Sequence, residues 1–170
     1  MDFRDKKNDD ILEKLVHINR IAKVVKGGRR FGFSALVVVG NQAGKIGIAH
    51  AKAKQVPDAI KKANETARRN LIHIPLREGR TIHHDVYAKD GAGKIVLRGA
   101  SKGTGIIAGG PVRAVCEVLG IKDIVAKSMG TSNPHNVIRA TLKALLKQNS
   151  PKHISLIRNK KISEIVEKRG

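Results

Sequence analysis

A short basic segment with two glycines is the part of this sequence best suited to binding phosphate. It reads Lys23-Val24-Val25-Lys26-Gly27-Gly28-Arg29-Arg30-Phe31 and includes four basic side chains. Glycine lets the backbone come close to a phosphate and exposes N–H donors, and arginine can donate two parallel hydrogen bonds to phosphate oxygens. The alternative is a solvated basic turn, because charge runs are usually solvated. The net charge of the chain favours phosphate binding.

A second glycine-rich segment, residues 103–111, lies between a predicted strand and a predicted helix. Three of its residues fit a loose form of the dinucleotide fingerprint, namely Gly103, Gly105 and Ala108. Two details argue against a nucleotide. Pro111 as first helical residue leaves the glycines before the helix, and Asp123 is expected at the start of the next strand, where a ribose-binding acid does not belong. A turned or flexible loop, an RNA contact and a protein contact remain open.

Groups suited to catalysis or to metal binding are sparse. His83 and His84 are adjacent and, on a predicted strand, would point to opposite faces, which suits chelation badly. Cys116 lies in an apolar stretch and is expected to be a buried, inert thiol. The acids of the second half form no close pair. We therefore expect no enzyme, no metal site, no cofactor and no small-molecule substrate.

The sequence Phe31-Gly32-Phe33 is weakly similar to the aromatic strand motif of single-strand RNA readers. We expect Phe31 or Phe33 to be a packing residue, with base stacking as the alternative. Aromatic residues make up only 2% of the chain, so RNA recognition through the backbone is the better prediction.

The charge of the whole chain indicates a polyanionic partner. Lysine and arginine total 34 against 14 acidic residues, a formal net charge of +20 in 170 residues. Such an excess is tolerated most easily when a negative partner neutralises it, and nucleic acid is the usual candidate. The single cysteine suits a reducing compartment, and no apolar run has the length of a signal peptide core or a membrane span. These features predict a cytoplasmic protein without a membrane partner.

The first half of the chain reads as three strands and a helix. Strands are predicted at 18–25, 31–40 and 45–52, separated by glycine-containing turns. A helix is predicted from Pro57 to Leu71. Its apolar face is Ile60, Ala63, Ala67 and Leu71, and its basic residues Lys61, Lys62, Arg68 and Arg69 lie elsewhere.

The second half alternates strands and helices after a boundary at Pro75–Arg80. Strands are predicted at 81–89, 94–100 and 123–127, with a helix at 111–119 that stops at Gly120. A last clear helix starts after Asn133-Pro134 and ends before Pro151. Its predicted apolar face is Val137, Ile138, Thr141, Leu142, Leu145 and Leu146. The tail is expected to form a short helix around 163–168 or to be partly disordered.

Three segments of the chain together resemble the bacterial form of small-subunit ribosomal protein number five. In chain order they are VVKGGRRFGFSALVVVGN (24–41), AKAKQVPDAIKKANETARRN (51–70) and GASKGTGIIAGGPVRAVCEVLGIKDIVAKSMGTSNPHNVIRAT (99–141). The resemblance covers about Leu12 to Pro151. It implies an α+β protein with a flexible N-terminus (1–11), a double-stranded-RNA-binding-like domain with a three-stranded antiparallel sheet and a helix (12–75), an α/β domain with a left-handed βαβ crossover (80–150), and a basic tail (151–170).

The resemblance also implies a function without catalysis. Members of this family are structural constituents of the small ribosomal subunit that bind 16S rRNA, stabilise the head relative to the body and contribute to translational accuracy. Their protein neighbours are ribosomal proteins number four and number eight. By matching positions, the hairpin 23–30 would contact RNA near the head, in the region linked to spectinomycin response, and the loop with Gly103, Gly105 and Arg113 would face protein number four.

Together these inferences give one set of candidate RNA-binding residues: Arg20, Lys23, Lys26, Gly27, Gly28, Arg29, Arg30, Lys52, Lys54, Lys61, Lys62, Arg68 and Arg69. Two rival functions are a small kinase or other nucleotide-binding enzyme that uses the 103–110 loop, and a free-standing double-stranded RNA adaptor.

Overall fold

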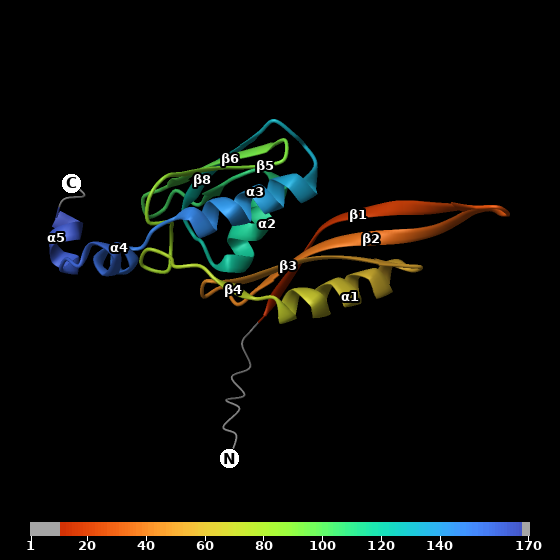
Figure 1. Cartoon of the computed structure of the whole chain (residues 1–170), viewed down its shortest axis with the longest axis horizontal. Helices are drawn as coiled ribbons and strands as arrows, with labels where there is room; N and C mark the ends of the chain where they lie inside the picture. The colour runs from red at the N-terminus through yellow and green to blue at the C-terminus, as the bar shows by residue number, and fades with distance from the viewer. Residues whose placement is uncertain (1–10, 168–170) are drawn as a thin grey trace, which may run out of the picture.

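The computed structural model describes residues 11–167, which form an α+β structure with two four-stranded sheets (Figure 1). The first sheet has the order β1-β2-β3-β4 and is antiparallel throughout. Its elements are β1 (Leu12–Val25), β2 (Gly28–Gly40), β3 (Lys45–Ala53), α1 (Val56–Arg69) and β4 (Ile72–His73). Nearly all of the N-terminus predicted at 1–11 lies outside the described residues.

The first sheet differs from its prediction in two respects. β1 begins at Leu12 instead of residue 18, because its first half also pairs with β2, from Leu12 opposite Gly40 to Leu15 opposite Val37. The short β4 pairs with the start of β3 and adds a fourth strand where three were predicted. The β1–β2 and β2–β3 hairpins themselves are confirmed.

The ends of β1 and β2 form a two-stranded ribbon that leaves the sheet. β3 ends at Ala53, opposite Phe33, so residues 21–25 and 28–32 pair only with each other. A turn at Lys26 and Gly27 closes the ribbon, which Figure 1 shows extending far beyond α1 and the second sheet. The predicted phosphate-binding segment therefore occupies the tip of an exposed hairpin.

The first sheet is covered on both faces along its central part. On one face, Ala35, Val37 and Val39 of β2 pack against the helix α1. The buried residues of α1 are Ala59, Ala63 and Ala67. The predicted apolar face was partly wrong, because Ile60 is only half-buried and Leu71 follows the end of the helix. Alanines on this helix face let α1 lie close to the sheet.

The second sheet has the order β5-β6-β8-β7, and helices α2 and α3 pack on it. Its strands are β5 (Val86–Asp90), β6 (Gly93–Gly99), β7 (Ile106–Ile107) and β8 (Ile124–Met129). β7 and β8 are parallel neighbours joined by α2 (Gly110–Leu119), so they form a βαβ unit. That this crossover is left-handed stays a prediction.

Several boundaries in the second half were predicted wrongly. β5 starts only at Val86, because residues 82–85 leave the sheet, so His83 and His84 lie in a bend and not on a strand. The short β7 within the glycine segment was not foreseen. Helix α3 (Pro134–Lys147) begins as predicted, with the Asn133 side chain accepting the His135 N–H. Leu146, expected on its apolar face, is half exposed.

The chain continues after α3 as two short helices. Pro151 does not merely terminate α3, because it begins α4 (Pro151–Arg158), where the Ser150 side chain accepts the His153 N–H. Helix α5 (Ile162–Glu167) follows and supports the helical alternative for the tail. Lys168, the last residue of that predicted helix, lies outside the described range.

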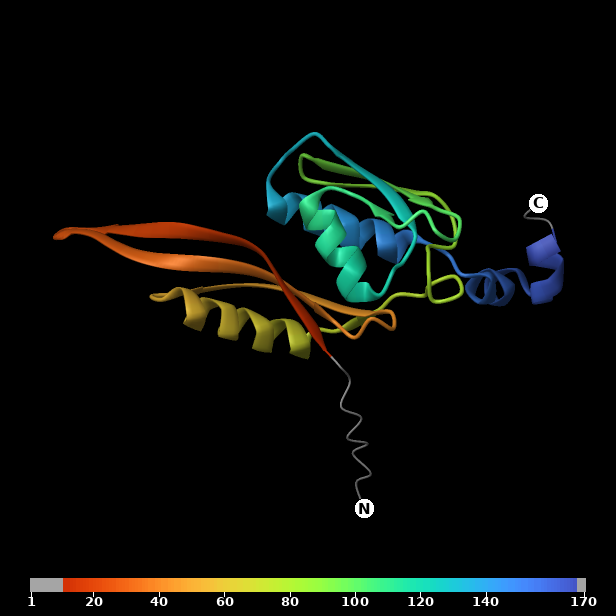
Figure 2. The ribbon, with the colours of Figure 1, turned by 180° about the vertical axis from the view of Figure 1, so that it is seen from behind.

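One hydrophobic core joins the two sheets. Leu36, Val38 and Ile46 on the second face of the first sheet belong to the same buried cluster as α2, α3 and the second sheet. The carbonyls of Val118 and Leu119 at the end of α2 accept hydrogen bonds from Gln42 and Gly44 N–H in the β2–β3 loop, both at 3.1 Å. Figure 2 shows α2 resting with this end on the first sheet. The loop thus satisfies carbonyls that a helix end leaves without intrahelical partners.

Candidate nucleic-acid interface

The ribbon presents its basic residues to solvent on both faces. Side chains alternate between the faces of a strand, and Lys23 lies opposite Arg30 while Val24 lies opposite Arg29. Lys23 and Arg30 therefore share the face that bears Leu36, and Arg29 lies on the face that α1 covers farther back. The five residues from Lys26 to Arg30 are all exposed. A polyanion could contact this tip from either side.

One aromatic residue of the ribbon is held under an arginine. The Arg20 guanidinium carbon lies 4.0 Å from the centroid of the Phe31 ring, on the α1 face of the ribbon. Phe31 is 52% exposed, whereas Phe33 is half-buried, so the expected packing role fits Phe33 and not Phe31. Arg20 thus stacks on an aromatic ring and still presents its edge to solvent.

The remaining candidate cations of the first half do not form one surface with the tip. Lys52 lies opposite Ser34, on the face turned away from α1. Lys61, Lys62 and Arg69 are exposed on α1, and Lys54 is exposed just before it. Arg68 forms an ion pair with Glu13 of β1 at 2.7 Å, and Glu13 partly neutralises the charge of Arg68. The predicted set therefore spans two faces of the sheet.

The glycine loop is organised around a buried carboxylate. Asp123 is buried, and its Oδ1 accepts the N–H of Gly103 at 3.0 Å and of Gly105 at 3.1 Å. Its Oδ2 accepts two bonds from the Arg80 guanidinium, the shorter at 2.6 Å. These bonds, led by that from Gly105, hold the pKa of Asp123 below its ordinary value. The N–H groups of Gly103 and Gly105 are therefore not free to bind a nucleotide phosphate.

The outer side of this loop is open to a partner. A side chain at Gly103 or Gly105 would meet no atom within 4 Å, although both glycines have positive φ. Arg113 of α2 is half exposed and donates to the Ile106 carbonyl at 2.7 Å. Arg113 and the loop thus lie side by side, as the sequence prediction of a shared protein contact requires.

The structure adds a histidine cluster that sequence reasoning missed. The rings of His50 in β3 and His135 in α3 lie edge to face, with centroids 4.8 Å apart. Burial lowers the pKa of both, and nearby cations, Lys52 and Arg139 among them, lower it further. The two histidines are isolated in the sequence, and only the fold, which places the first turn of α3 beside β3, brings them together.

The single cysteine of the chain, Cys116, lies within α2. Cys116 is buried, and burial raises the pKa of its thiol to about 12, as expected of an inert cysteine. Among residues 11–167 no three His, Cys, Asp or Glu side chains form a group that could hold a metal ion. No helix in that range is both long and apolar enough to cross a membrane.

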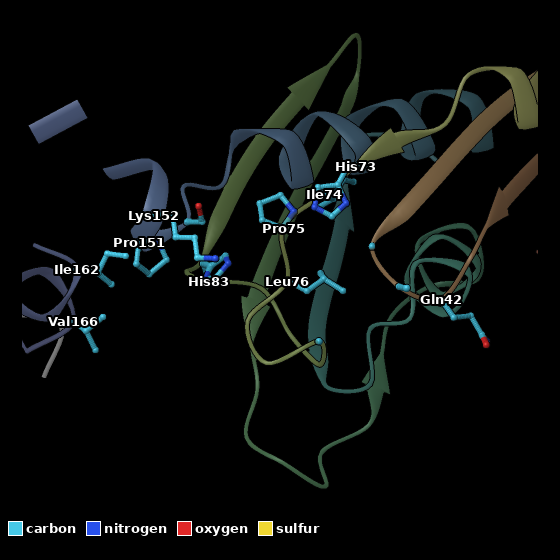
Figure 3. A pocket seen from close by; sticks show the side chains of 14 residues that line it. Gln42, His73, Ile74, Pro75, Leu76, His83, Pro151, Lys152, Ile162 and Val166 are labelled. Atoms are coloured by element: carbon cyan, nitrogen blue, oxygen red, sulfur yellow. The ribbon is translucent and has the colours of Figure 1, made fainter. Parts of the chain in front are cut away.

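A mainly apolar pocket lies away from these basic residues. It has a volume of about 790 Å³ and lies between the chain segment that connects the two sheets and the helices α4 and α5 (Figure 3). Ile74, Pro75 and Leu76 line one side, and Pro151, Ile162 and Val166 line the other. Its apolar lining does not suit phosphate, so it is not part of the candidate interface.

Comparisons with known proteins agree with the two-part structure. The family model described as the ribosomal protein S5 N-terminal domain matches residues 11–75, and the model of the ribosomal protein S5 C-terminal domain matches residues 88–158. Proteins named small ribosomal subunit protein uS5 are similar along the chain. The one from Pelagibacter ubique is 89% identical over 170 residues and covers all of both chains. Those from Nitrobacter winogradskyi and Azorhizobium caulinodans are each 58% identical over 166 residues, which are 98% of this chain and 87% and 90% of theirs.

Proposed function

This chain belongs to the ribosomal protein S5 family, and we propose that it is a structural constituent of the small ribosomal subunit that binds 16S rRNA through its backbone. The family is a structural component of the ribosome and not a family of enzymes. The observation that carries the proposal is the 89% identity to a uS5 protein along the full length of both chains. The protein would accordingly act in the cytoplasm, within the assembled subunit.

The β1–β2 ribbon is the proposed primary contact with rRNA. Its tip carries Lys26, Arg29 and Arg30 around two glycines, and none of the three cations takes part in an ion pair within residues 11–167. Each of these cations can therefore neutralise a phosphate without first losing an internal partner. The first half would bind as a double-stranded-RNA-binding-like domain, with the exposed cations of α1 and Lys54 as further phosphate contacts.

The second half is proposed to contact proteins of the subunit. The open side of the loop at Gly103 and Gly105, together with Arg113, would face ribosomal protein number four, and number eight is the second proposed neighbour. The shared core of the two sheets makes the chain a rigid connector. A rigid connector between rRNA and a protein neighbour would hold the head of the subunit relative to its body and thereby contribute to translational accuracy.

The salt dependence of RNA binding tests the ribbon. The logarithm of the affinity for 16S rRNA should fall linearly with the logarithm of salt concentration, by about 0.7 to 0.9 per phosphate neutralised. The triple variant Lys26→Ala, Arg29→Ala, Arg30→Ala should reduce this slope by up to about 2 to 3. A matched triple in the exposed tail, Arg158→Ala, Lys160→Ala, Lys161→Ala, removes the same charge and should leave the slope nearly intact.

The two triple variants decide between a specific contact and a general charge effect. Equal slopes for the ribbon variant and the wild type would remove the ribbon from the RNA interface. Cosedimentation with small subunits provides the second test, because an integral constituent stays bound after a moderate-salt wash. A free-standing RNA adaptor would be released.

A further inference from the structure

We propose that the junction between the two sheets holds an RNA phosphate among His50, His135, Lys52 and Arg139, and that binding there takes up a proton. This inference rests on the proposed RNA-binding function and assigns to it a second contact, distinct from the ribbon tip. The observation behind it is the pair of histidine rings that meet across the junction, surrounded by cations.

The fold positions the two histidines from different halves of the chain. His50 of β3 lies opposite Leu36 of β2, and Leu36 lies opposite His17 of β1. These three side chains therefore form a row on the face turned away from α1. His135 is the second residue of α3. Both ribbon views show the beginning of α3 above the root of the β1–β2 ribbon (Figures 1 and 2). The junction is therefore bordered by both sheets.

The charges around the imidazoles are all positive. Lys52 on β3 and Arg139 on α3 act on His50, and Arg139, His50 and His17 act on His135. The acid of the helix packed between the sheets, Glu117 of α2, is paired with Lys14 and lies near Arg113. Within residues 11–167, none of the ion pairs includes Lys52 or Arg139. An unneutralised cluster of this kind attracts an anion.

Continuity with the ribbon indicates that the anion is an RNA phosphate. Lys23 and Arg30 lie on the same face as His17 and Lys52, closer to the tip of the ribbon. The six residue steps from His17 to Lys23 span about 20 Å of strand. The amino-terminal end of α3 adds a favourable dipole beside His135. An RNA backbone bound at the tip could thus follow this face back to the junction.

The proton uptake follows from the electrostatics. In the free protein, burial and the neighbouring cations lower the pKa of both histidines, so the pair is mostly neutral near neutral pH. A bound phosphate neutralises the cations and accepts a hydrogen bond from an imidazolium, which raises the pKa again. Binding must then strengthen as the pH falls, by at most about tenfold per pH unit for each coupled proton.

The test measures the dissociation constant of the full-length protein for a 16S rRNA transcript by filter binding at constant ionic strength, from pH 8 to pH 6. The variants are the double substitution His50→Gln, His135→Gln and the control His153→Gln, whose histidine is exposed on α4. Circular dichroism at each pH checks that every variant is folded. Because the RNA is the same throughout, proton binding by its bases cancels in the comparison.

The wild type and His153→Gln should bind about threefold or more tightly at pH 6 than at pH 8. The double variant should lack this gain, so that its affinity falls further below that of the wild type as the pH decreases. If the folded double variant keeps the pH dependence, or weakens binding equally at every pH, the junction site is overturned and the ribbon contact stands. If the wild type does not bind the transcript at any pH, the proposed function fails as well.

Discussion

Asp123 accepts the backbone N–H of Gly105 at 3.1 Å and thereby closes the glycine loop on an internal carboxylate. The same oxygen accepts Gly103, and Arg80 binds the other oxygen of the carboxylate. Two N–H groups of a loop whose spacing suggests phosphate binding are thus bonded to a side chain of the protein itself. The outer side of the loop remains available to a neighbouring protein.

Replacing Asp123 by Asn should destabilise the protein by about 2 kcal/mol. The amide oxygen of asparagine can still accept the two glycine N–H groups, but its NH₂ group then faces the Arg80 guanidinium, and two donors cannot bond. Urea unfolding followed by circular dichroism measures the effect. The control Asp85→Asn removes an exposed carboxylate 3.8 Å from Arg98 and should cost less than about 1 kcal/mol.

The same comparison has a pH signature. Because the pKa of Asp123 is lowered from 3.8 in the folded protein, its stabilisation is fully present above that value and is lost as the pH falls through the folded pKa. The difference between wild type and Asp123→Asn should shrink accordingly in strong acid. Equal stability of the two proteins at neutral pH would contradict the role given to Asp123.

Gly120→Ala should destabilise the junction between the sheets by about 2 kcal/mol or more. Gly120 ends α2 with a φ of 92°, and a Cβ there would lie 2.0 Å from the Gln42 carbonyl oxygen of the β2–β3 loop. The loop could not keep its hydrogen bonds to the end of α2. Thermal and urea unfolding measure the loss.

Gly110→Ala is the matched control, because it lies at the other end of the same helix and an added Cβ meets nothing within 4 Å. Alanine also favours the helix, so this variant should be neutral or slightly stabilised. Similar losses for both variants would show that glycine content in α2, and not the close contact with Gln42, sets the effect.

Mild acid should weaken the free protein through the histidine pair. The folded pKa of His50 and of His135 lies below 6.5, so their contribution to stability is present above pH 6.5 and is lost as the pH falls through the folded pKa. His135→Gln should reduce the loss of unfolding free energy between pH 7.5 and pH 5, and His153→Gln should not. Identical pH profiles for wild type and His135→Gln would contradict the coupling. When RNA is bound, we expect the free energy of unfolding to rise instead of fall as the pH decreases.

ATP should leave the melting temperature unchanged, and a 16S rRNA fragment should raise it. The loop N–H groups of Gly103 and Gly105 are occupied by Asp123, so ATP finds no free amide cradle there, whereas RNA stabilises the folded state by mass action. Thermal shift assays at matched ionic strength make the comparison. Stabilisation by ATP alone would favour the rival nucleotide-binding function.

Local patterns were enough to predict most of the elements. Alternating apolar residues and glycine turns identified the β1–β2 and β2–β3 hairpins, and Asn133-Pro134 and Gly120 correctly mark the start of α3 and the end of α2. The predictions failed where pairing is short or non-local. The two-residue strands β4 and β7 have no periodicity of their own and exist only through β3 and β8.

The sequence by itself determined that this protein is strongly basic, poor in aromatics and equipped with an exposed basic hairpin, because charge and turn chemistry are local properties. Only the tertiary structure decided which charges act together. The shared core of the two sheets placed His135, at the start of α3, beside His50 of β3, and the fold carried Asp123 to the glycine loop. These pairs are distant in the chain, and a distance of a few ångströms between them is fixed only when their elements share a core.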